Sequence, residues 1–572
     1  MNNVLSIHPA DRADDARLPL VVGIAADRTL TAEAAHRAEE PVAKILADLR
    51  NLYQATPLLL LLQLPSMLRG FADRLAETFA ADIVDLEDHP ALVLGSGGAQ
   101  TTDLGGDARE ATTRRAAFLA DHCHLAIAIS ESRETPGDLV AQIIQFRLQG
   151  IPDRHTGRPL QLENVGLGGV HHVVAGERDR AAAADAPEST FILPQVATPQ
   201  GSEELDDATA WDHLNRFNGD VAGQLKRRVL APRAARSRPP ALPGDVWVGD
   251  RFAVANALAI QFQRATHATT FGLLVLGLMA ALAFQLSGRL PYATSVYTAS
   301  LVLAYGWYLW AYWRRYEHRF HDYRALAEGL RVQMYWSAAG ITACAADYYL
   351  RRQRSEFEWI RQALRAWTLT AGSSAYASPL PPGEGPGVRG LQQVCEQWVD
   401  DQWNYYRRTA LRHQSLGTWL NRAGKGFFLL GLLLVAARPL LREDLALTMA
   451  IGLAPAVAAL LYIYAQTRAF LEQARQYDRM GRLFDRARLR LRQVLDAGDA
   501  AAFQRLLLDL GKEALRENAD WVLLHRERPI TFGSAHSWVQ AGSWLLGVLF
   551  RRRRKAPPRV SEGSTDRRSR AA

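Results

Sequence analysis

Residues 271–313 read FGLLVLGLMAALAFQLSGRLPYATSVYTASLVLAYGWYLWAYW, and Arg289 is the one charged residue among them. From Ala265 to Gly288 there is no Asp, Glu, Lys or Arg, and the same holds from Leu290 to Trp313. Each segment exceeds the roughly 20 residues that an α-helix needs to cross the hydrocarbon of a bilayer. A Gly and a Pro in the turn between them end both helices. The stretch therefore predicts a transmembrane helical hairpin; the alternative is a buried helical hairpin in a large soluble core.

A second uncharged region follows later in the chain. Leu445–Thr467 is long enough to span a bilayer, whereas the apolar run Gly426–Ala437 has about half of the usual spanning length. If the preceding helix runs from Thr418 to Leu441, its basic residues can extend toward the lipid headgroups at both ends. These segments predict a second hairpin, and the long polar helix after each hairpin indicates a diverged duplication.

The segment after Trp313 begins with arginine and aromatic residues and then places apolar residues at helical spacing. Leu326, Leu330 and Met334 form one apolar face. We therefore expect one long helix to continue from the membrane into the cytosol, with a break near Gly340. Such a rigid element would couple the soluble part of the protein to the first hairpin.

The composition limits the kinds of partner. The chain has 572 residues, a formal net charge of +8 and 22% charged residues. Many of its arginines flank the apolar segments or lie in the run at 551–555, so we interpret them as membrane-flanking charge and expect no nucleic acid. Cys123, Cys344 and Cys395 are far apart, which argues against a disulfide framework or a zinc site. We expect no cofactor and no metal, and the first residues lack the apolar core of a cleavable signal peptide.

The N-terminal third of the chain alternates apolar strands with helices. The strands are expected at Leu18–Ala26, Thr56–Leu64, Ile83–Leu86 and Leu125–Ser130. Strands that are apolar throughout and separated by helices are typical of a parallel sheet covered on both faces. The predicted fold class is an α/β Rossmann-like N-terminal domain, followed by an all-α membrane region with two transmembrane helical hairpins and long cytosolic helices.

Five motifs follow one another between about residues 20 and 175: VVGIAADR, TPLLLLL, RGFADRLAETF, HLAIAISESRETPGDLVAQIIQFRLQGIP and VHHVV. In this order they resemble the SLOG domains, which are Rossmann-like relatives of the LOG nucleotide-processing enzymes. The turns of that superfamily contain glycines. The resemblance implies a nucleotide-derived ligand, such as a second messenger, bound over Gly23, Arg28, Arg69, Gly70 and Gly137.

The glycines of those turns are partly lost in this chain. Glycine lets backbone N–H groups approach a phosphate at a helix N-terminus, but Met67, Leu68 and Phe71 are bulky beside such a site. Asp138 would cap the later helix and occupy its donors. Since no catalytic Glu stands in a Gly-rich signature, we do not expect an enzyme. The alternative is that the following are structural turn and surface residues: Arg28, Arg69, Asp73, Arg74 and Gly137.

Three further motifs lie after the first hairpin: DYRALAEGLRVQMYW at 322–336, ADYYLRRQR at 346–354 and GKEALRENADWVLLHRERP at 511–529. They resemble the SLATT group of two-span effectors, which are associated with SLOG sensors, and the resemblance covers about 250–530. It implies that the membrane part forms a pore when an attached sensor is engaged.

The expected organisation has seven parts in chain order. They are a disordered N-terminus (1–17), a Rossmann-like SLOG-type domain (18–177), a linker with a possible helix (178–245), a first transmembrane hairpin with a cytosolic helix (246–370), a Pro/Gly/Ser linker (371–390), a second transmembrane hairpin with a cytosolic helix (391–530) and a basic C-terminal tail (531–572).

The expected function is that of an effector in a bacterial defence or conflict system. Its SLOG-like domain would sense a nucleotide-derived ligand or a partner, and its oligomerised spans would form a pore in, or disrupt, the lipid bilayer. Because arginines flank both ends of the first hairpin, the positive-inside rule predicts a multi-pass protein of the cytoplasmic membrane with both termini in the cytosol. Two alternatives stay open: a membrane-anchored nucleotide-processing enzyme related to LOG proteins, and a passive membrane scaffold.

Overall fold

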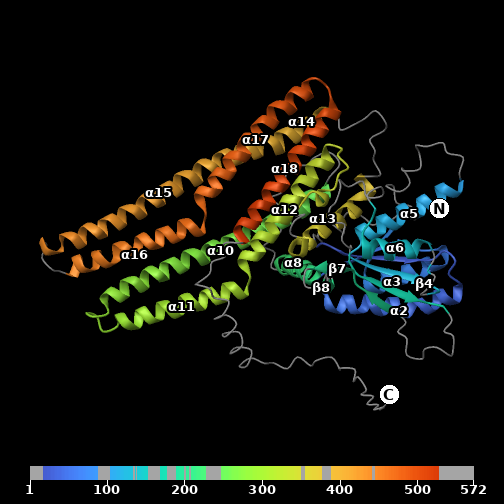
Figure 1. Cartoon of the computed structure of the whole chain (residues 1–572), viewed down its shortest axis with the longest axis horizontal. Helices are drawn as coiled ribbons and strands as arrows, with labels where there is room; N and C mark the ends of the chain where they lie inside the picture. The colour runs from blue at the N-terminus through green and yellow to red at the C-terminus, as the bar shows by residue number, and fades with distance from the viewer. Residues whose placement is uncertain are drawn as a thin grey trace, which may run out of the picture. The chain divides into compact units, whose positions relative to one another are not determined.

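The computed structural model describes an N-terminal sheet region and a helical C-terminal region (Figure 1). The described residues are 17–87, 104–132, 136, 138–152, 168–176, 189–198, 201–204, 208–226, 246–349, 354–375, 388–440 and 445–526. Several predictions concern residues outside these ranges. They are almost all of the N-terminus 1–17, most of the linker 371–390, the tail 531–572 and Gly137.

The N-terminal region is built around a six-stranded sheet with the order β3-β2-β1-β4-β5-β6. Its strands are β1 (Leu20–Ala26), β2 (Leu58–Gln63), β3 (Asp82–Asp85), β4 (Leu125–Ser130), β5 (Val170–Val174) and β6 (Ser189–Ile192). Neighbouring strands are parallel, except that β5 and β6 are antiparallel. The prediction of a largely parallel sheet is confirmed, and the strand order is that of Rossmann folds.

Helices cover both faces of this sheet (Figure 1). They are α2 (Ala32–Leu52), α3 (Arg69–Phe79), α5 (Leu104–His122) and α6 (Asp138–Gln149). In β1, Val22 and Ile24 belong to the apolar cluster that contains α2 and α3, whereas Val21 and Ala25 belong to the cluster that contains α5 and α6. Successive residues of a strand point to opposite faces, so a strand covered on both sides is apolar at every position.

The segment 178–245, expected to be a linker with a possible helix, also contains strands. It supplies β6 to the main sheet and a separate antiparallel pair, β7 (Gln195–Thr198) with β8 (Gly201–Glu204). Helix α8 (Ala208–Lys226) lies where a helix was expected. The buried side chain of Asn218 accepts from the N–H of Leu18 and donates to its carbonyl oxygen, both at 2.8 Å. These bonds fix α8 to the start of the sheet region.

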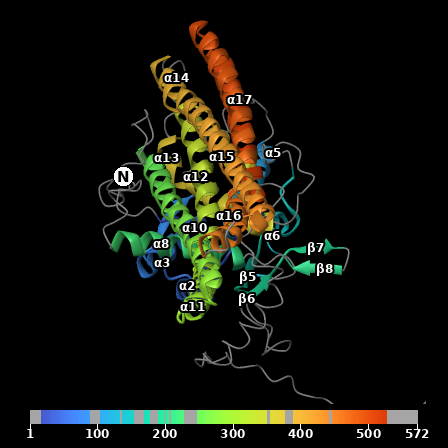
Figure 2. The same cartoon turned by 90° about the vertical axis from the view of Figure 1, so that its left-hand side faces the viewer.

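The helical region contains two pairs of helices that fold back on themselves (Figures 1 and 2). Its helices are α10 (Val246–Leu286), α11 (Ala293–Trp313), α12 (Tyr316–Ala338), α13 (Arg354–Ala375), α14 (Val388–Val394), α15 (Asp401–Ala437), α16 (Leu445–Thr467), α17 (Phe470–Asp496) and α18 (Ala500–Arg526), with a π-helical turn at Cys395–Asp400. In the first pair, the rings of Phe284 and Tyr297 lie 5.6 Å apart between α10 and α11. In the second, a Cβ at Gly431 of α15 would lie 3.0 Å from Pro455 of α16.

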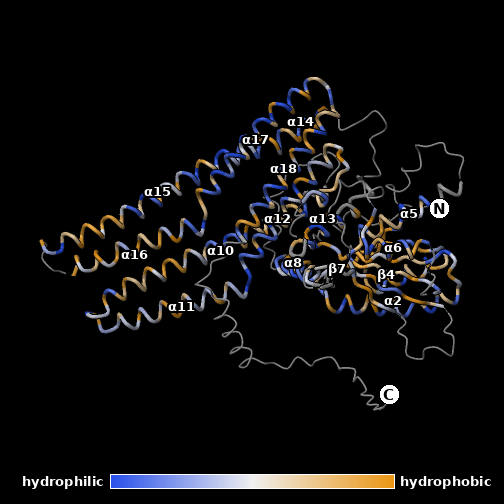
Figure 3. The backbone as a smooth tube through the Cα atoms, in the orientation of Figure 1, coloured by the Kyte–Doolittle hydropathy of each residue, from blue (hydrophilic) through white to orange (hydrophobic). Residues whose placement is uncertain are grey.

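Three of the described helices are long and apolar enough to cross a membrane: Asp250–Leu286, Val388–Leu440 and Leu445–Asp496. Their hydrophobic parts lie in the order α15, α16, α10, with α11 next to α10 (Figure 3). Large apolar side chains are exposed there; Val302 of α11 and Leu433 of α15 are each 65% exposed. Extended exposed apolar surface is unusual on soluble proteins, so these helices indicate a membrane protein. Helix α11 also has no charged residue, but it is not among these three stretches. It contains many aromatic and hydroxyl side chains.

The long helix expected after Trp313 is interrupted, which corrects the prediction of one rigid element. Helix α11 ends at Trp313, α12 begins at Tyr316, and Arg315 between them adopts a left-handed conformation with φ 50°. A left-handed residue breaks the helical path. The element that runs without interruption between the apolar and the soluble helices is α10, not α11 with α12.

The same interruption occurs after the second pair of helices. Ala469, between α16 and α17, has φ 45°. In each unit the first residue of the following helix and a tyrosine two turns later pack on one ring of the long helix: Tyr316 and Tyr323 on Phe262, and Phe470 and Tyr477 on His413. This repeated packing supports the interpretation of the two units as a diverged duplication.

Replacing Arg315 by glycine is expected to stabilise the protein. Glycine adopts left-handed conformations without the penalty of about 1 kcal/mol that other residues incur. The matched control is Arg314→Gly, which removes the same charge at a residue with φ −73° and is expected to destabilise slightly. The measurement is the apparent melting temperature of both variants in detergent. Equal melting temperatures, or a lower one for Arg315→Gly, would contradict the prediction.

Candidate functional site

The carboxyl edge of the parallel sheet is the place where the sequence predicts a ligand. In sheets of this topology ligands bind where neighbouring strands lead away in opposite directions, here beyond β1 and β4. Arg28 follows β1 and is exposed, while Arg69 and Gly70 begin α3 after β2. Gly137 lies outside the described residues. The structure therefore places three of the five predicted residues at this edge.

The remaining residue, Gly23, has a packing role inside the sheet. It pairs with Leu61 and Ala126 in the middle of β1. An added Cβ would lie 2.7 Å from the side chain of Leu119 and 3.0 Å from that of Cys123. Only glycine allows α5 to approach β1 this closely.

Arg69 is already paired with carboxylates of the chain. Its guanidinium lies 3.3 Å from Asp85, the last residue of β3, and 2.9 Å from Glu87, which follows β3. An anionic ligand at Arg69 would have to compete with these two acidic groups.

The N-terminus of α2, where a phosphate would bind in a Rossmann fold, is occupied by the chain itself. The Glu131 carboxylate accepts a 2.7 Å hydrogen bond from the N–H of Thr31, and the Thr31 hydroxyl accepts from the N–H of Ala34. Hydrogen bonds from the backbone N–H and the side chain of Thr31 lower the pKa of Glu131. Two of the donors that could hold an anion, the N–H groups of Thr31 and Ala34, are thus already used. Sequence reasoning missed Glu131, although an acidic residue directly after β4 was a signal for such a role.

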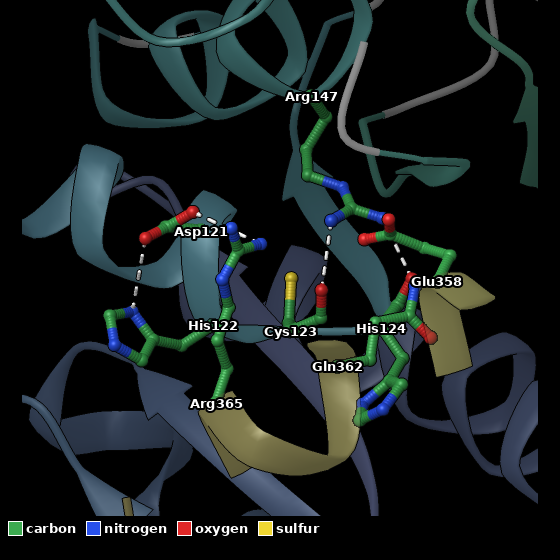
Figure 4. A pocket seen from close by; sticks show the side chains of 8 residues that line it. All are labelled: Asp121, His122, Cys123, His124, Arg147, Glu358, Gln362 and Arg365. Carbon is green, nitrogen blue, oxygen red and sulfur yellow. Dashed lines mark hydrogen bonds and ion pairs between the residues drawn. The ribbon is translucent and has the colours of Figure 1, made fainter. Parts of the chain in front are cut away.

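A buried arginine lies at the end of the sheet where β4 begins, opposite the carboxyl edge (Figure 4). Arg147 of α6 is 1% exposed, and its guanidinium donates to the carbonyl oxygens of Ala120, Cys123, His124 and Gly169 at 2.7–3.4 Å. One side chain therefore satisfies backbone groups at the end of α5 and before β4 and β5. Such groups are costly to leave unpaired in the interior.

Helix α13 joins this edge to the helical region. The Arg365 guanidinium lies 3.6 Å from Asp121 of α5 and 3.5 Å from Asp347, which precedes α13 (Figure 4). Burial lowers the pKa of His122 to about 4 and that of His124 to about 3, so both imidazoles are neutral at pH 7. The space between these groups is about 10 Å³, roughly the room for one water molecule. We interpret this contact as structural.

A larger space lies among the soluble parts of the helices. This interhelical cavity has a volume of about 460 Å³, within the range of small-molecule sites. It is lined by Asn256, Ala259, Ile260 and Gln263 of α10, by Phe320, Arg324, Glu328, Arg331 and Val332 of α12, by Trp398 of the π-helical turn, by Asp401, Gln402, Tyr405 and Tyr406 of α15, by Tyr477 and Phe484 of α17, and by Ala514, Glu517, Asn518 and Trp521 of α18.

Charged side chains cluster on the inner wall of the cavity. Glu328 contacts Arg324 at 2.5 Å and Arg331 at 3.0 Å. Burial raises the pKa of Glu517 to about 8, and the negative charge of Glu328 adds to this effect. Glu517 is therefore mostly protonated at pH 7. Two arginines then face one ionised carboxylate, so this wall carries a net positive charge.

Comparisons with protein-family models, curated proteins and solved structures find no match. The resemblances to SLOG and SLATT proteins stay predictions, and function has to be argued from geometry. Among the described residues, no group of three or more His, Cys, Asp or Glu side chains is placed to hold a metal ion.

The interhelical cavity was not predicted from the sequence. Its walls come from segments that are far apart in the chain, so no local pattern brings them together. One signal was present: the motifs at 322–336 and 511–529 supply most of its charged inner wall, including Arg324, Glu328 and Glu517. The charges within otherwise buried helical segments pointed to a polar interior.

Proposed function

We propose that this protein is a signal-responsive membrane effector, in which ligand or partner binding to the soluble region causes the membrane helices to permeabilise the bilayer. One observation carries the proposal. Helices α10 and α15 line the interhelical cavity near their N-termini and continue without interruption into the apolar segments. A change in the cavity that shifts either helix also moves its apolar end, because an α-helix transmits displacement along its axis.

The packing supports four membrane crossings rather than three. Helix α12 packs on the N-terminal half of α10, where Phe262 contacts Tyr316 and Tyr323. If the C-terminal half of α10 crosses the bilayer, the chain must return before α12 begins. Helix α11, which has no charged residue, is the segment that connects them. Two hairpins are therefore proposed, with α11 as the more aromatic of the four spans.

Small residues hold the two hairpins together. A Cβ at Gly277 of α10 would lie 3.4 Å from Leu460 of α16, and one at Gly452 of α16 would lie 1.8 Å from the amide of Gln285. Close approach at glycine is a common way for helices to pack in lipid. The outer faces of α11 and α15 then remain available to lipid or to further copies of the chain, and we propose that copies assemble to form the pore.

The charge distribution supports a cytosolic location of both soluble regions. Arg264 precedes the first apolar segment, and Arg314, Arg315 and Arg319 follow α11, whereas the turn between the helices contains only Arg289. From the positive-inside rule we propose that both termini lie in the cytosol. We further propose that the membrane is the cytoplasmic membrane of a bacterium. Glu131, which occupies the N-terminus of α2, weighs against the alternative of a nucleotide-processing enzyme at the sheet edge.

The test is induced expression in bacteria with a membrane-potential dye. The full chain is expected to depolarise the cells. Gly452→Leu should insert into the membrane but lose this activity, because a leucine must displace the Gln285 side chain and occupy the space in which α10 and α16 approach each other. Gly306→Leu is the matched control, since no atom lies within 4 Å of a Cβ at that position on α11. A parent chain that enters the membrane and leaves the potential unchanged would support a passive scaffold instead.

A further inference from the structure

We infer that the interhelical cavity binds a flat aromatic anion, meaning a ring system that carries a phosphate or a carboxylate. This deepens the proposed function by naming a ligand class, and it rests on that function for the consequence of binding but not for binding itself. The observation behind it is a set of hydrogen-bond donors on the inner wall, with aromatic side chains around them. At the sheet edge, by contrast, the carboxylate of Glu131 already accepts a hydrogen bond from the N-terminus of α2.

The inner wall offers more donors than acceptors. Arg324 and Arg331 share the single carboxylate of Glu328, and each guanidinium has five N–H donors, more than the described contacts use. The indole N–H of Trp521 is buried and has no hydrogen-bond partner in the described part of the chain. An unpaired buried donor costs roughly 1–3 kcal/mol. The donors of Arg324 and Arg331 are the ones on which the inference rests.

The remaining walls present aromatic rings. Tyr405 is 42% exposed, and Asp401 one turn earlier is also exposed, so α15 forms the mouth of the cavity. Further inside, the rings of Tyr406 and Tyr477 lie 5.9 Å apart, and Tyr406 lies 5.4 Å from Phe484. Rings packed in this way offer faces and edges to a planar ligand.

The charges favour an anion over an aromatic cation. On the inner wall two arginines face Glu328, and Glu517 opposite them is mostly protonated at pH 7. Asp401 at the mouth is the one further carboxylate among the lining residues, and deeper in the cavity the carboxylate of Glu328 is already paired with Arg324 and Arg331. An anionic group would instead find arginine, which binds phosphate and carboxylate through paired N–H groups.

The test is calorimetric titration of the purified full chain in detergent. The probes are adenosine 5′-monophosphate and indole-3-carboxylate, which separate the phosphate from the carboxylate as the anionic group. We expect saturable binding of at least one. Adenosine lacks the negative charge, inorganic phosphate lacks the ring, and tryptamine carries a positive charge. Each of the three should bind at least 10-fold more weakly than the anion that binds. Tighter binding of tryptamine, or no binding of either anion, overturns the inference.

Two variants locate the site. Arg331→Gln removes one charged donor and should weaken binding about 10- to 100-fold, the equivalent of about 1.5–3 kcal/mol. Tyr405→Ala removes a half-exposed ring at the mouth and should weaken binding without affecting folding. Arg408→Gln is the control, because this arginine is exposed on α15 and does not line the cavity. Unchanged affinity in both Arg331→Gln and Tyr405→Ala would place the site elsewhere and overturn the inference.

The pH dependence gives an independent readout. The groups that act on the Glu517 carboxyl are Glu328 and Arg324 of α12, Gln476 of α17 and Asp520 of α18. As the pH rises from 7 to 9, Glu517 ionises and repels an anion, so affinity should fall. In Glu517→Gln this fall should disappear. An affinity for the anionic probe that rises with pH would contradict the inference. Since these titrations do not depend on membrane activity, binding without depolarisation would refute the proposed function alone, and depolarisation without binding would refute this inference alone.

Discussion

Replacing Ala268 by proline is expected to abolish depolarisation while leaving the protein in the membrane. Ala268 is exposed on α10, between the cavity residue Gln263 and the apolar run that starts at Phe271. Proline removes a backbone hydrogen bond and collides with the preceding turn, which costs about 3 kcal/mol or more and breaks or bends the helix. The cavity and the apolar segment keep their own side chains, but the rigid connection between them is lost.

The controls for this experiment are Ala268→Gly and Ala268→Leu. Glycine costs about 1 kcal/mol in a helix and leucine is nearly neutral, so both should keep α10 continuous and active. The measurements are the membrane fraction of each variant and the response of the potential dye. Full activity of an inserted Ala268→Pro protein would mean that α10 does not couple the two regions, and the proposed mechanism would then depend on α15 alone.

Proline at Ala327, on the helix first expected to be the coupler, would be a poorer test. Ala327 is 0% exposed within α12, so proline there would disrupt the soluble helices themselves. Arg315 already separates α12 from α11. Loss of activity in that variant would therefore not distinguish broken coupling from unfolding.

Arg147→Met is expected to lower the free energy of unfolding of the sheet region by about 3–5 kcal/mol. Methionine fills a similar volume but leaves four carbonyl oxygens, of Ala120, Cys123, His124 and Gly169, without this donor. Removal of one buried partner from such a network has a cost in this range. The measurement is the apparent melting temperature of the full chain in detergent, followed by circular dichroism.

Arg109→Met provides the matched control, because Arg109 is exposed on α5. It should change stability by less than about 0.5 kcal/mol. Arg147→Lys should fall between the two, since a single ammonium group has fewer donors than a guanidinium and a different geometry. A loss below about 1 kcal/mol in Arg147→Met would show that water or a local shift satisfies these carbonyl groups.

Local patterns in the sequence were sufficient to predict three strands of the sheet and the uncharged helices. The strands β1, β2 and β4 were predictable because a strand covered on both faces is apolar at every position. Uncharged runs of spanning length identified the membrane part, since burial of charge in lipid is costly. These signals lie within one element, so composition and periodicity reveal them.

Contacts between distant residues were decided only by the tertiary structure. Glu131 binds the N–H of Thr31 across about a hundred residues, and this bond fills the edge where a nucleotide was predicted. The interhelical cavity joins Asn256 to Trp521 through helices whose charges look, in sequence, like solvated faces.

The interruption at Arg315 also escaped prediction, because neither glycine nor proline marks it. The sequence by itself determined which segments are apolar enough to enter a membrane and which form the parallel strands, because these properties follow from the composition of each segment alone. Only the tertiary structure decided which helix is continuous, which carboxylate fills the sheet edge and where a cavity remains. Each of these features depends on contacts between residues that are far apart in the sequence.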